Sequence, residues 1–240
     1  MSETPEFDPD EDSFDPAFYG RGENSLTEAE RDALGDITGF DILVTPEGTL
    51  EEALSLANLG ANVTLLGRLT DDSRIAIEQT GVSLNLVGGR LEEGATLLES
   101  RTFDIVYSPW GSLDGLASFE PWAARVSECL KPGGHLFVFD EHPVSFLVGA
   151  RDGELVVQSA YWGEFEDLDN DGVESEFDVP TGWALGDLVT ALGTEGVATL
   201  RLEEVSDAGT YLTALSLLEG VDDERRSLLP CAFLLVARKL

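Results

Sequence analysis

Apolar runs of strand length alternate with helix signals from residue 27 to the end of the chain, and this alternation restricts the fold more than any other feature. The runs are rich in Val, Ile, Leu and Phe, as expected of strands that helices cover on both faces. Strands in alternation with helices predict a doubly wound α/β domain with a mostly parallel sheet. The predicted strands are 40–44, 62–66, 82–87, 103–107, 135–139, 198–203 and 232–237.

Capping residues and glycines mark the helices between these strands. Thr27 and Glu30 have the spacing of a capping box that opens a helix ending at Gly35. Thr49 and Glu52 have the same spacing and open a helix that ends at Gly60. The other predicted helices are 71–79, closed by Gly81, then 119–130, stopped by Lys131-Pro132-Gly133-Gly134, and 181–192.

Residues 1–24 differ from the rest of the chain in composition. They hold eight acidic residues, three prolines and no lysine, so we expect an acidic, disordered tail. Phe14, Phe18 and Tyr19 could still dock this segment onto the domain. Residues 25–240 then form one domain of ordinary α/β size.

The net charge is the outlier of the composition. Fourteen Lys and Arg residues stand against 47 Asp and Glu residues, which gives −33 at pH 7. Nucleic acid and anionic membranes are not expected as partners, because cationic side chains must neutralise both. An acidic surface with two lysines, Lys131 and Lys239, indicates a halophilic protein from a salt-rich cytoplasm. An acidic protein from a mesophile with a GC-rich genome is the alternative.

Cysteine spacing and hydropathy indicate a cytoplasmic protein. Cys129 and Cys231 lie far apart in apolar segments, which favours two buried thiols over a disulfide. The N-terminal residues lack the apolar stretch of a signal peptide, and no run of 18 apolar residues predicts a membrane span. The sequence gives no indication of the oligomeric state.

The order of several segments resembles the class I S-adenosylmethionine-dependent methyltransferases over about residues 25–240. Glu141-His142-Pro143 is similar to a signature of one branch that acts on small molecules. The resemblance implies a seven-stranded, mostly parallel sheet of the Rossmann-like type with an antiparallel last strand. The segments that carry it are 41–60, 103–108, 130–134, 136–140 and 229–239.

The chain departs from this family where the family binds its cofactor. The family's Asp-x-Gly-x-Gly-x-Gly loop corresponds to Val44–Leu50, in which Gly48, followed by Thr49, is the one glycine that remains. Pro46 has no N–H to donate. Leu50 puts a branched side chain where the last glycine of the family makes room.

Two further positions of the family's cofactor site are glycines in this chain. The resemblance places Gly67 where an acid binds the ribose and Gly89 where an acid holds the adenine. Losing both hydrogen bonds to charged groups would cost about 3–5 kcal/mol, or roughly a hundred- to a thousandfold in affinity. Compensation by Arg68 or Arg90, or a one-residue shift of the alignment, is the alternative.

These losses favour a methyltransferase-like pseudoenzyme without a cofactor. It would serve as a non-catalytic binding, regulatory or partner subunit, with a protein or a small molecule as its partner. One alternative is an active S-adenosylmethionine-dependent methyltransferase that acts on a small molecule through an atypical cofactor site. Another is a different enzyme that reuses the same site, since a fold does not by itself define a function.

Polar residues after the fourth and fifth strands of the alternating pattern are the remaining candidates for chemistry. Ligand sites of doubly wound sheets lie beyond the carboxyl ends of the strands, and His142 follows the strand 135–139 closely. His142 could act as a general base on a substrate hydroxyl. Ser108 and Trp110 could line the same site. The structural alternatives are a turn at His142-Pro143 and packing at Trp110.

An acidic segment from Asp167 to Asp178 follows the pattern of a calcium-binding loop. Asp167, Asp169 and Asp171 take the first, third and fifth positions, Gly172 the sixth and Asp178 the twelfth. No clear pair of flanking helices accompanies the loop, so it is not a true EF-hand. The sequence predicts either a lone Ca²⁺ loop or a solvated acidic loop.

Overall fold

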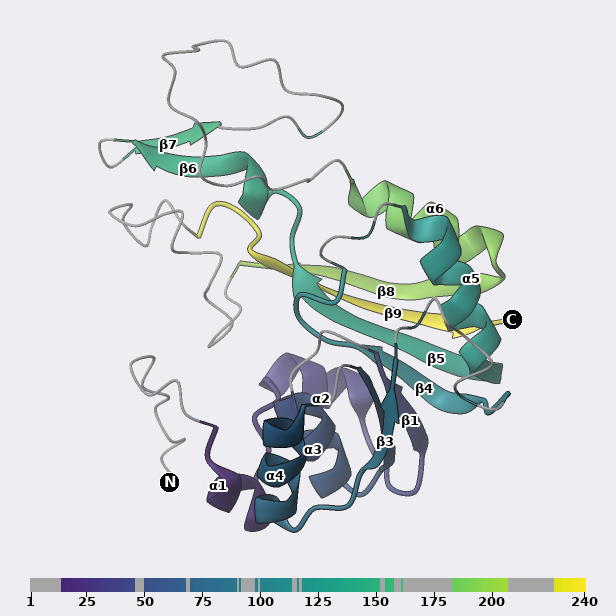
Figure 1. Cartoon of the computed structure of the whole chain (residues 1–240). Helices are drawn as coiled ribbons and strands as arrows, with labels where there is room; N and C mark the ends of the chain where they lie inside the picture. Colours follow the sequence, from purple (N-terminus) through teal and green to yellow (C-terminus); the bar gives the residue numbers. More distant parts are fainter. Residues whose placement is uncertain are drawn as a thin grey trace.

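A seven-stranded sheet with the order β3-β2-β1-β4-β5-β9-β8 forms the centre of the fold (Figure 1). The computed structural model describes residues 14–45, 50–67, 70–89, 91, 98, 100–113, 116, 118–151, 154–157, 161, 183–206 and 227–240. The strands of the sheet are β1 Asp41–Val44, β2 Asn62–Gly67, β3 Asn85–Gly88, β4 Phe103–Ser108, β5 Leu130–Glu141, β8 Val197–Val205 and β9 Ala232–Lys239.

Strand direction confirms the predicted fold class. β3, β2, β1, β4 and β5 pair in parallel, and β9 pairs antiparallel with both β5 and β8. The last strand of the chain therefore lies between β5 and β8 and runs against both. This is the doubly wound, Rossmann-like sheet with an antiparallel last strand that the sequence predicts.

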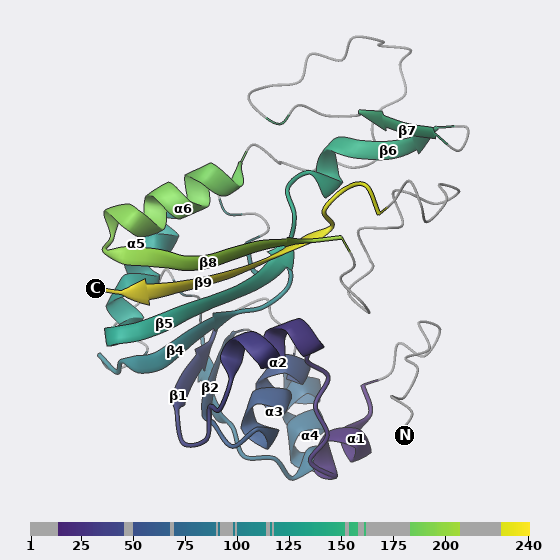
Figure 2. The same cartoon turned by 180° about the vertical axis from the view of Figure 1, so that it is seen from behind.

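Helices cover both faces of this sheet (Figures 1 and 2). Residues of α5 and α6 close one core cluster with Leu43 and Val106, and residues of α3 close the other with Ile42 and Tyr107. Neighbouring strand residues thus serve opposite faces, which explains their continuous apolar runs. The helices are α1 Pro16–Gly20, α2 Glu28–Leu34, α3 Leu50–Asn58, α4 Asp71–Thr80, α5 Phe119–Cys129 and α6 Leu185–Thr194.

Local capping signals are confirmed where the structure describes them. The Thr27 hydroxyl accepts from the Glu30 N–H at 3.2 Å, and the Glu30 carboxylate accepts from the Thr27 N–H at 2.8 Å, which makes a capping box on α2. Gly81 ends α4 in the left-handed conformation, with φ 70°. Thr49, the predicted cap of α3, lies outside the described residues.

The segment Lys131–Gly134 ends α5 but is not a separate turn. β5 already begins at Leu130, which pairs with Phe103, so these residues belong to the strand. Gly134 passes close to β4, because a Cβ at this position would lie 3.0 Å from the Asp104 carbonyl oxygen and 3.1 Å from that of Phe103. The glycine permits a close approach of two backbones.

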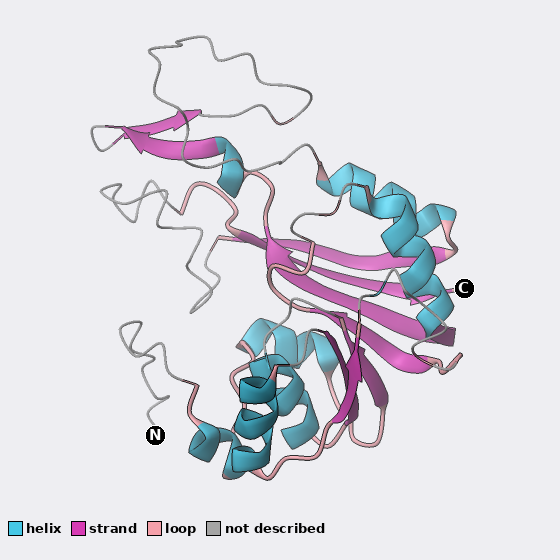
Figure 3. Ribbon diagram, in the orientation of Figure 1, coloured by secondary structure: helices cyan, strands magenta, loops and turns pink. Residues whose placement is uncertain are grey.

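Four of the described elements have no counterpart among the predicted ones: α1, a 3-10 helix, β6 and β7. Within the described part of the predicted tail, α1 packs on α4 and buries Tyr19, and Asn58 donates to the Tyr19 carbonyl at 2.9 Å. A short 3-10 helix, Ser145–Leu147, leads into the hairpin of β6 Val148–Arg151 and β7 Glu154–Val157. Figure 3 shows this hairpin projecting from the sheet near the carboxyl end of β5.

None of the helices in the described ranges has the length and apolar character needed to cross a lipid bilayer. Cys129 and Cys231 are both buried as free thiols. Burial raises the pKa of Cys129 to about 11. Both cysteines therefore act as small apolar core residues.

Candidate functional site at the carboxyl edge of the sheet

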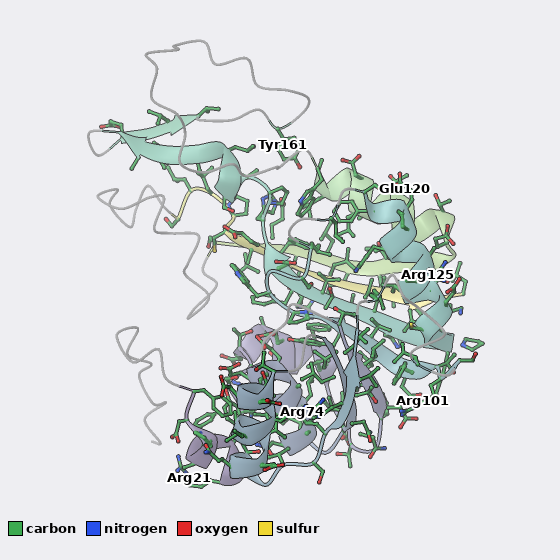
Figure 4. The ribbon with its side chains drawn as sticks, in the orientation of Figure 1. Arg21, Arg74, Arg101, Glu120, Arg125 and Tyr161 are labelled. Atoms are coloured by element: carbon green, nitrogen blue, oxygen red, sulfur yellow. The ribbon has the colours of Figure 1, made fainter. Side chains whose placement is uncertain are left out.

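The order of the strands reverses between β1 and β4, and this reversal locates the site. β1 lies beside both β2 and β4, with Val44 paired to Leu65 on one side and to Tyr107 on the other. In open α/β sheets, ligands bind outside the carboxyl ends of the strands at such a switch point. Arg101, which precedes β4, lies at the opposite edge in Figure 4.

The end of β1 is firmly held against β4. The Thr45 N–H donates to the Tyr107 carbonyl at 2.9 Å, which extends the pairing one residue beyond the strand. Gly48 and Thr49 lie outside the described residues. Leu50, expected to obstruct the cofactor, is partly buried and packs against the core cluster on the α3 side of the sheet.

The ends of β2 and β3 meet at glycines. Gly67 pairs with Gly88, and the Gly89 N–H donates to the Gly67 carbonyl at 3.3 Å. A Cβ added at Gly88 would meet no atom within 4 Å. Gly67, Gly88 and Gly89 have no side chains, and together they are called the glycine floor below. Gly88 is exposed, and neither acid of the family stands at Gly67 or Gly89.

The loop after β4 is the most polar part of the described site. Ser108, at the end of β4, lies 2.5 Å from Ser112, hydroxyl to hydroxyl, and both are buried. The carboxylate of Asp140, near the end of β5, accepts backbone N–H groups of this loop. Trp110 lies 5.8 Å from Phe139, centroid to centroid, and is partly buried. The sequence brings Ser108 and Trp110 to this edge, but it gives no signal for the role of Asp140.

His142 lies at the same edge, but both of its ring nitrogens are engaged. The Val144 N–H donates to Nδ1 at 3.1 Å, so the hydrogen of the neutral ring is on Nε2, which donates to Glu204 Oε1 at 2.9 Å. The ring is 2 % exposed. Burial lowers the pKa of His142, while Glu204 acts in the opposite direction. Through these contacts His142 joins the end of β5 to the edge strand β8, and its role as a general base stays a prediction.

The predicted calcium loop lies outside the described residues, and this applies to Asp167, Asp169, Asp171 and Asp178. Within the residues that the structure describes, no group of three or more His, Cys, Asp or Glu side chains could hold a metal ion.

Comparisons with known proteins agree with this fold. No protein-family model matches the chain, and no curated protein matches its sequence. Among solved structures, an S-adenosylmethionine-dependent methyltransferase from Mesorhizobium loti aligns with a TM-score of 0.62 and 22% identity, over 88% of this chain and 95% of that one.

Two further solved structures give the same result. A TehB-like SAM-dependent methyltransferase from Corynebacterium glutamicum aligns with a TM-score of 0.53 and 16% identity, over 93% of this chain and 92% of that one. A SAM-dependent methyltransferase from Methanosarcina mazei aligns with a TM-score of 0.51 and 16% identity, over 90% and 99%.

These structures correct the prediction that the chain has no cofactor. The solved structures named above align over 92–99% of their own length and are described as S-adenosylmethionine-dependent methyltransferases, which contradicts the expectation of a fold without a cofactor. Leu50, expected to obstruct the cofactor, is partly buried against the core cluster on the α3 side of the sheet. The chain has the fold of the class I S-adenosylmethionine-dependent methyltransferases.

Proposed function

We propose that this protein is an S-adenosylmethionine-dependent methyltransferase that acts on a small molecule through an atypical cofactor site. The observation that carries the proposal is the methyltransferase fold of the sheet, in which β2 ends at Gly67 beside β1, the strand at the switch point, and Gly67 pairs with Gly88 of β3. A ligand site is expected at that place in such a sheet.

The residues that would hold the cofactor differ from those of the family. Gly67 and Gly88 would provide a backbone surface for the nucleoside, and the loop after β4 would provide a wall with Ser112 and Trp110. When bound, the cofactor supplies an electrophilic methyl group on a cationic sulfonium. A chain with a net charge of −33 favours the approach of such a cation.

The acceptor that we propose is a small molecule. Two of the solved structures cover 88% and 93% of this chain and 95% and 92% of their own, so they are of similar length, and one is described as a TehB-like methyltransferase. The Glu141-His142-Pro143 segment, which resembles a small-molecule branch, lies at the carboxyl edge with Glu141 and His142 buried. Because both nitrogens of His142 are engaged, the proposal assigns this residue no proton transfer.

Calorimetric titration with S-adenosylmethionine and S-adenosylhomocysteine tests the proposal. We expect dissociation constants tighter than about 50 μM, which corresponds to about −6 kcal/mol. Gly88→Trp is the matched variant, because it fills the open floor at a position where a Cβ meets no other atom. It should weaken both ligands without a change in the fold measured by circular dichroism. Absence of binding to the unaltered protein would overturn the proposal.

A further inference from the structure

The carboxylate of Asp140 holds the loop that follows β4 through two backbone hydrogen bonds. Oδ1 accepts from the Gly111 N–H at 2.8 Å, and Oδ2 accepts from the Leu113 N–H at 3.0 Å. Oδ1 also accepts from the N–H of Glu141 at 2.7 Å. The side chain is 1 % exposed. A buried carboxylate that accepts several N–H groups is a strong and directional tether.

Two further contacts fix the same loop, and they do not involve Asp140. The Ser108 and Ser112 hydroxyls are hydrogen-bonded across the loop, and Trp110 packs on Phe139. Gly111 adopts a φ of 77°, which allows the chain to turn between Trp110 and Ser112. The loop is therefore a built structure, tied to the ends of both β4 and β5.

The loop that Asp140 holds lies where a ligand is expected to bind. The loop leaves β4 at the switch point, where the strand order reverses and where the ligand of such a sheet lies. A loop that is already ordered before binding loses little conformational freedom when the ligand arrives, and affinity gains accordingly.

We propose that Asp140 is a positioning residue that holds the loop Pro109–Leu113 in place as a preformed wall of the S-adenosylmethionine site. The proposal rests on the proposed function, because it assumes that this cofactor is the ligand. Asp140 is not among the cofactor-binding positions that the family resemblance gives. It would act by holding the loop rather than by touching the ligand.

Two substitutions of different severity test the tether. Asp140→Asn keeps an acceptor oxygen for Gly111, but its amide group replaces Oδ2 and faces the Leu113 N–H with a second donor. Asp140→Ala removes all acceptors. Asp104→Asn is the matched control, because Asp104 also accepts a backbone N–H, from Asp41 at 2.9 Å, but at the amino edge of the sheet.

Hydrogen exchange measured by mass spectrometry reports on the loop directly. In the unliganded protein, we expect the peptide that contains Gly111 and Leu113 to exchange about tenfold faster in Asp140→Asn, and faster still in Asp140→Ala. Asp104→Asn should leave that peptide unchanged. Equal exchange in all four proteins would overturn the proposal whatever the ligand is.

Calorimetric titration of the same proteins with S-adenosylmethionine reports on the site. Asp140→Asn should weaken binding by about tenfold, which corresponds to about 1.4 kcal/mol, and Asp104→Asn should bind like the unaltered protein. If the unaltered protein binds and the Asp140 variants bind equally well, the positioning role is wrong and the proposed function stands. If the unaltered protein does not bind, the proposed function and the cofactor wall fail together.

A milder variant covers the case in which both Asp140 variants fail to fold. Ser112→Ala removes the hydrogen bond between the Ser108 and Ser112 hydroxyls and leaves the Asp140 carboxylate in place. Loop exchange and S-adenosylmethionine affinity should then change together. Faster exchange with unchanged affinity would show that the loop is not a wall of the site and would overturn the proposal.

Discussion

The hydroxyl of Tyr107 on β4 donates a hydrogen bond to Oε1 of Glu30 on α2, and both residues are buried. Oε2 of the same carboxyl accepts from the Thr27 N–H at 2.8 Å and from the Thr27 hydroxyl at 2.7 Å. A single glutamate thus caps α2 and fastens that helix to the centre of the sheet. The residue that completes a local capping box also makes a contact 77 positions away in sequence.

Glu30 should make the protein less stable as pH rises. Burial raises the pKa of Glu30, although the hydrogen bonds from Tyr107 and Thr27 act against it. Between the ordinary carboxyl pKa and the raised pKa of the folded state, the folded protein holds more protons than the unfolded chain, so stability falls with rising pH. The side chain of the Glu30→Gln variant stays neutral at every pH. As pH rises, the free energy of unfolding of the unaltered protein should therefore fall relative to that of the variant.

Urea unfolding from about pH 4.5 to about pH 7.5 measures this difference. Both proteins carry nearly the same surface charge, so the general effect of the acidic surface cancels in the comparison. Parallel pH profiles for the two proteins would contradict the assigned shift. Tyr107→Phe should lower stability at every pH by about 1–3 kcal/mol, because it leaves Oε1 without this donor in the buried site.

Lys131 should stabilise the fold through a small charge network at the amino edge of the sheet. Its Nζ lies 2.9 Å from Asp104 Oδ2 and 3.0 Å from Asp41 Oδ2, and Asp104 also accepts the Asp41 N–H. The three side chains are 34–41 % exposed. Solvent therefore screens the network, and Lys131→Met should cost only about 0.5–1 kcal/mol. That loss should shrink in about 1 M KCl, where the screening length falls to about 3 Å.

Arg125→Met is the control for the Lys131 measurement. Arg125 pairs with Glu128 within α5, and both side chains are exposed by more than a third. Such a pair within a helix contributes at most about 0.5 kcal/mol. Chemical unfolding of the unaltered protein, Lys131→Met and Arg125→Met at low and high salt measures the stability that each ion pair contributes. Equal losses for the two variants would mean that the network adds nothing beyond an ordinary surface pair.

The sequence predicts those helices and strands that are determined by short patterns of neighbouring residues. The capping box of Thr27 and Glu30 lies within four residues, and the apolar run at 103–107 is a buried strand wherever it pairs. The ties that shape the site are not local, since Asp140 reaches a loop 29 residues away at Gly111. An aspartate after a strand carries no signal of which N–H it will meet.

The cofactor prediction failed for a related reason. Gly67 and Gly89 are hydrogen-bonded to one another, but the effect of two missing acids on cofactor binding depends on the surrounding residues, which the sequence does not report. Leu50 was judged from a family pattern, whereas its side chain packs into the core. The hairpin of β6 and β7 was missed because its short strands lack an apolar run long enough to distinguish from a loop.

The glycine floor should tolerate an acid at one position and resist it at the next. A Cβ at Gly88 meets no atom within 4 Å, so Gly88→Asp should change the free energy of unfolding by less than about 0.5 kcal/mol. Gly89 has a φ of 150°, a conformation that side chains disfavour, so Gly89→Asp should cost about 1–3 kcal/mol. Thermal unfolding of the pair, which differs by one position and carries the same new charge, measures this contrast. Equal melting temperatures would be inconsistent with the backbone geometry at Gly89.

His142 should produce the opposite pH dependence from Glu30. Burial lowers the pKa of His142, so between the lowered pKa and the ordinary histidine value the unfolded chain holds more protons than the folded protein. Stability should therefore be complete above the ordinary value and be lost as pH falls below it. His142→Gln can still donate to Glu204, the acidic group facing Nε2 from β8, but cannot take up a proton.

The free energy of unfolding of the unaltered protein should therefore fall relative to His142→Gln as pH is lowered from about 7.5 to about 5. Glu204→Gln separates the two causes of the shift, because the neutral amide keeps a hydrogen-bond acceptor and removes the charge that raises the pKa. In that variant the loss of stability on acidification should be larger, since burial then acts without opposition. Chemical unfolding at each pH gives the three profiles. A smaller loss of stability on acidification in Glu204→Gln than in the unaltered protein would contradict the assignment, because it would mean that the Glu204 carboxylate does not raise the pKa of His142.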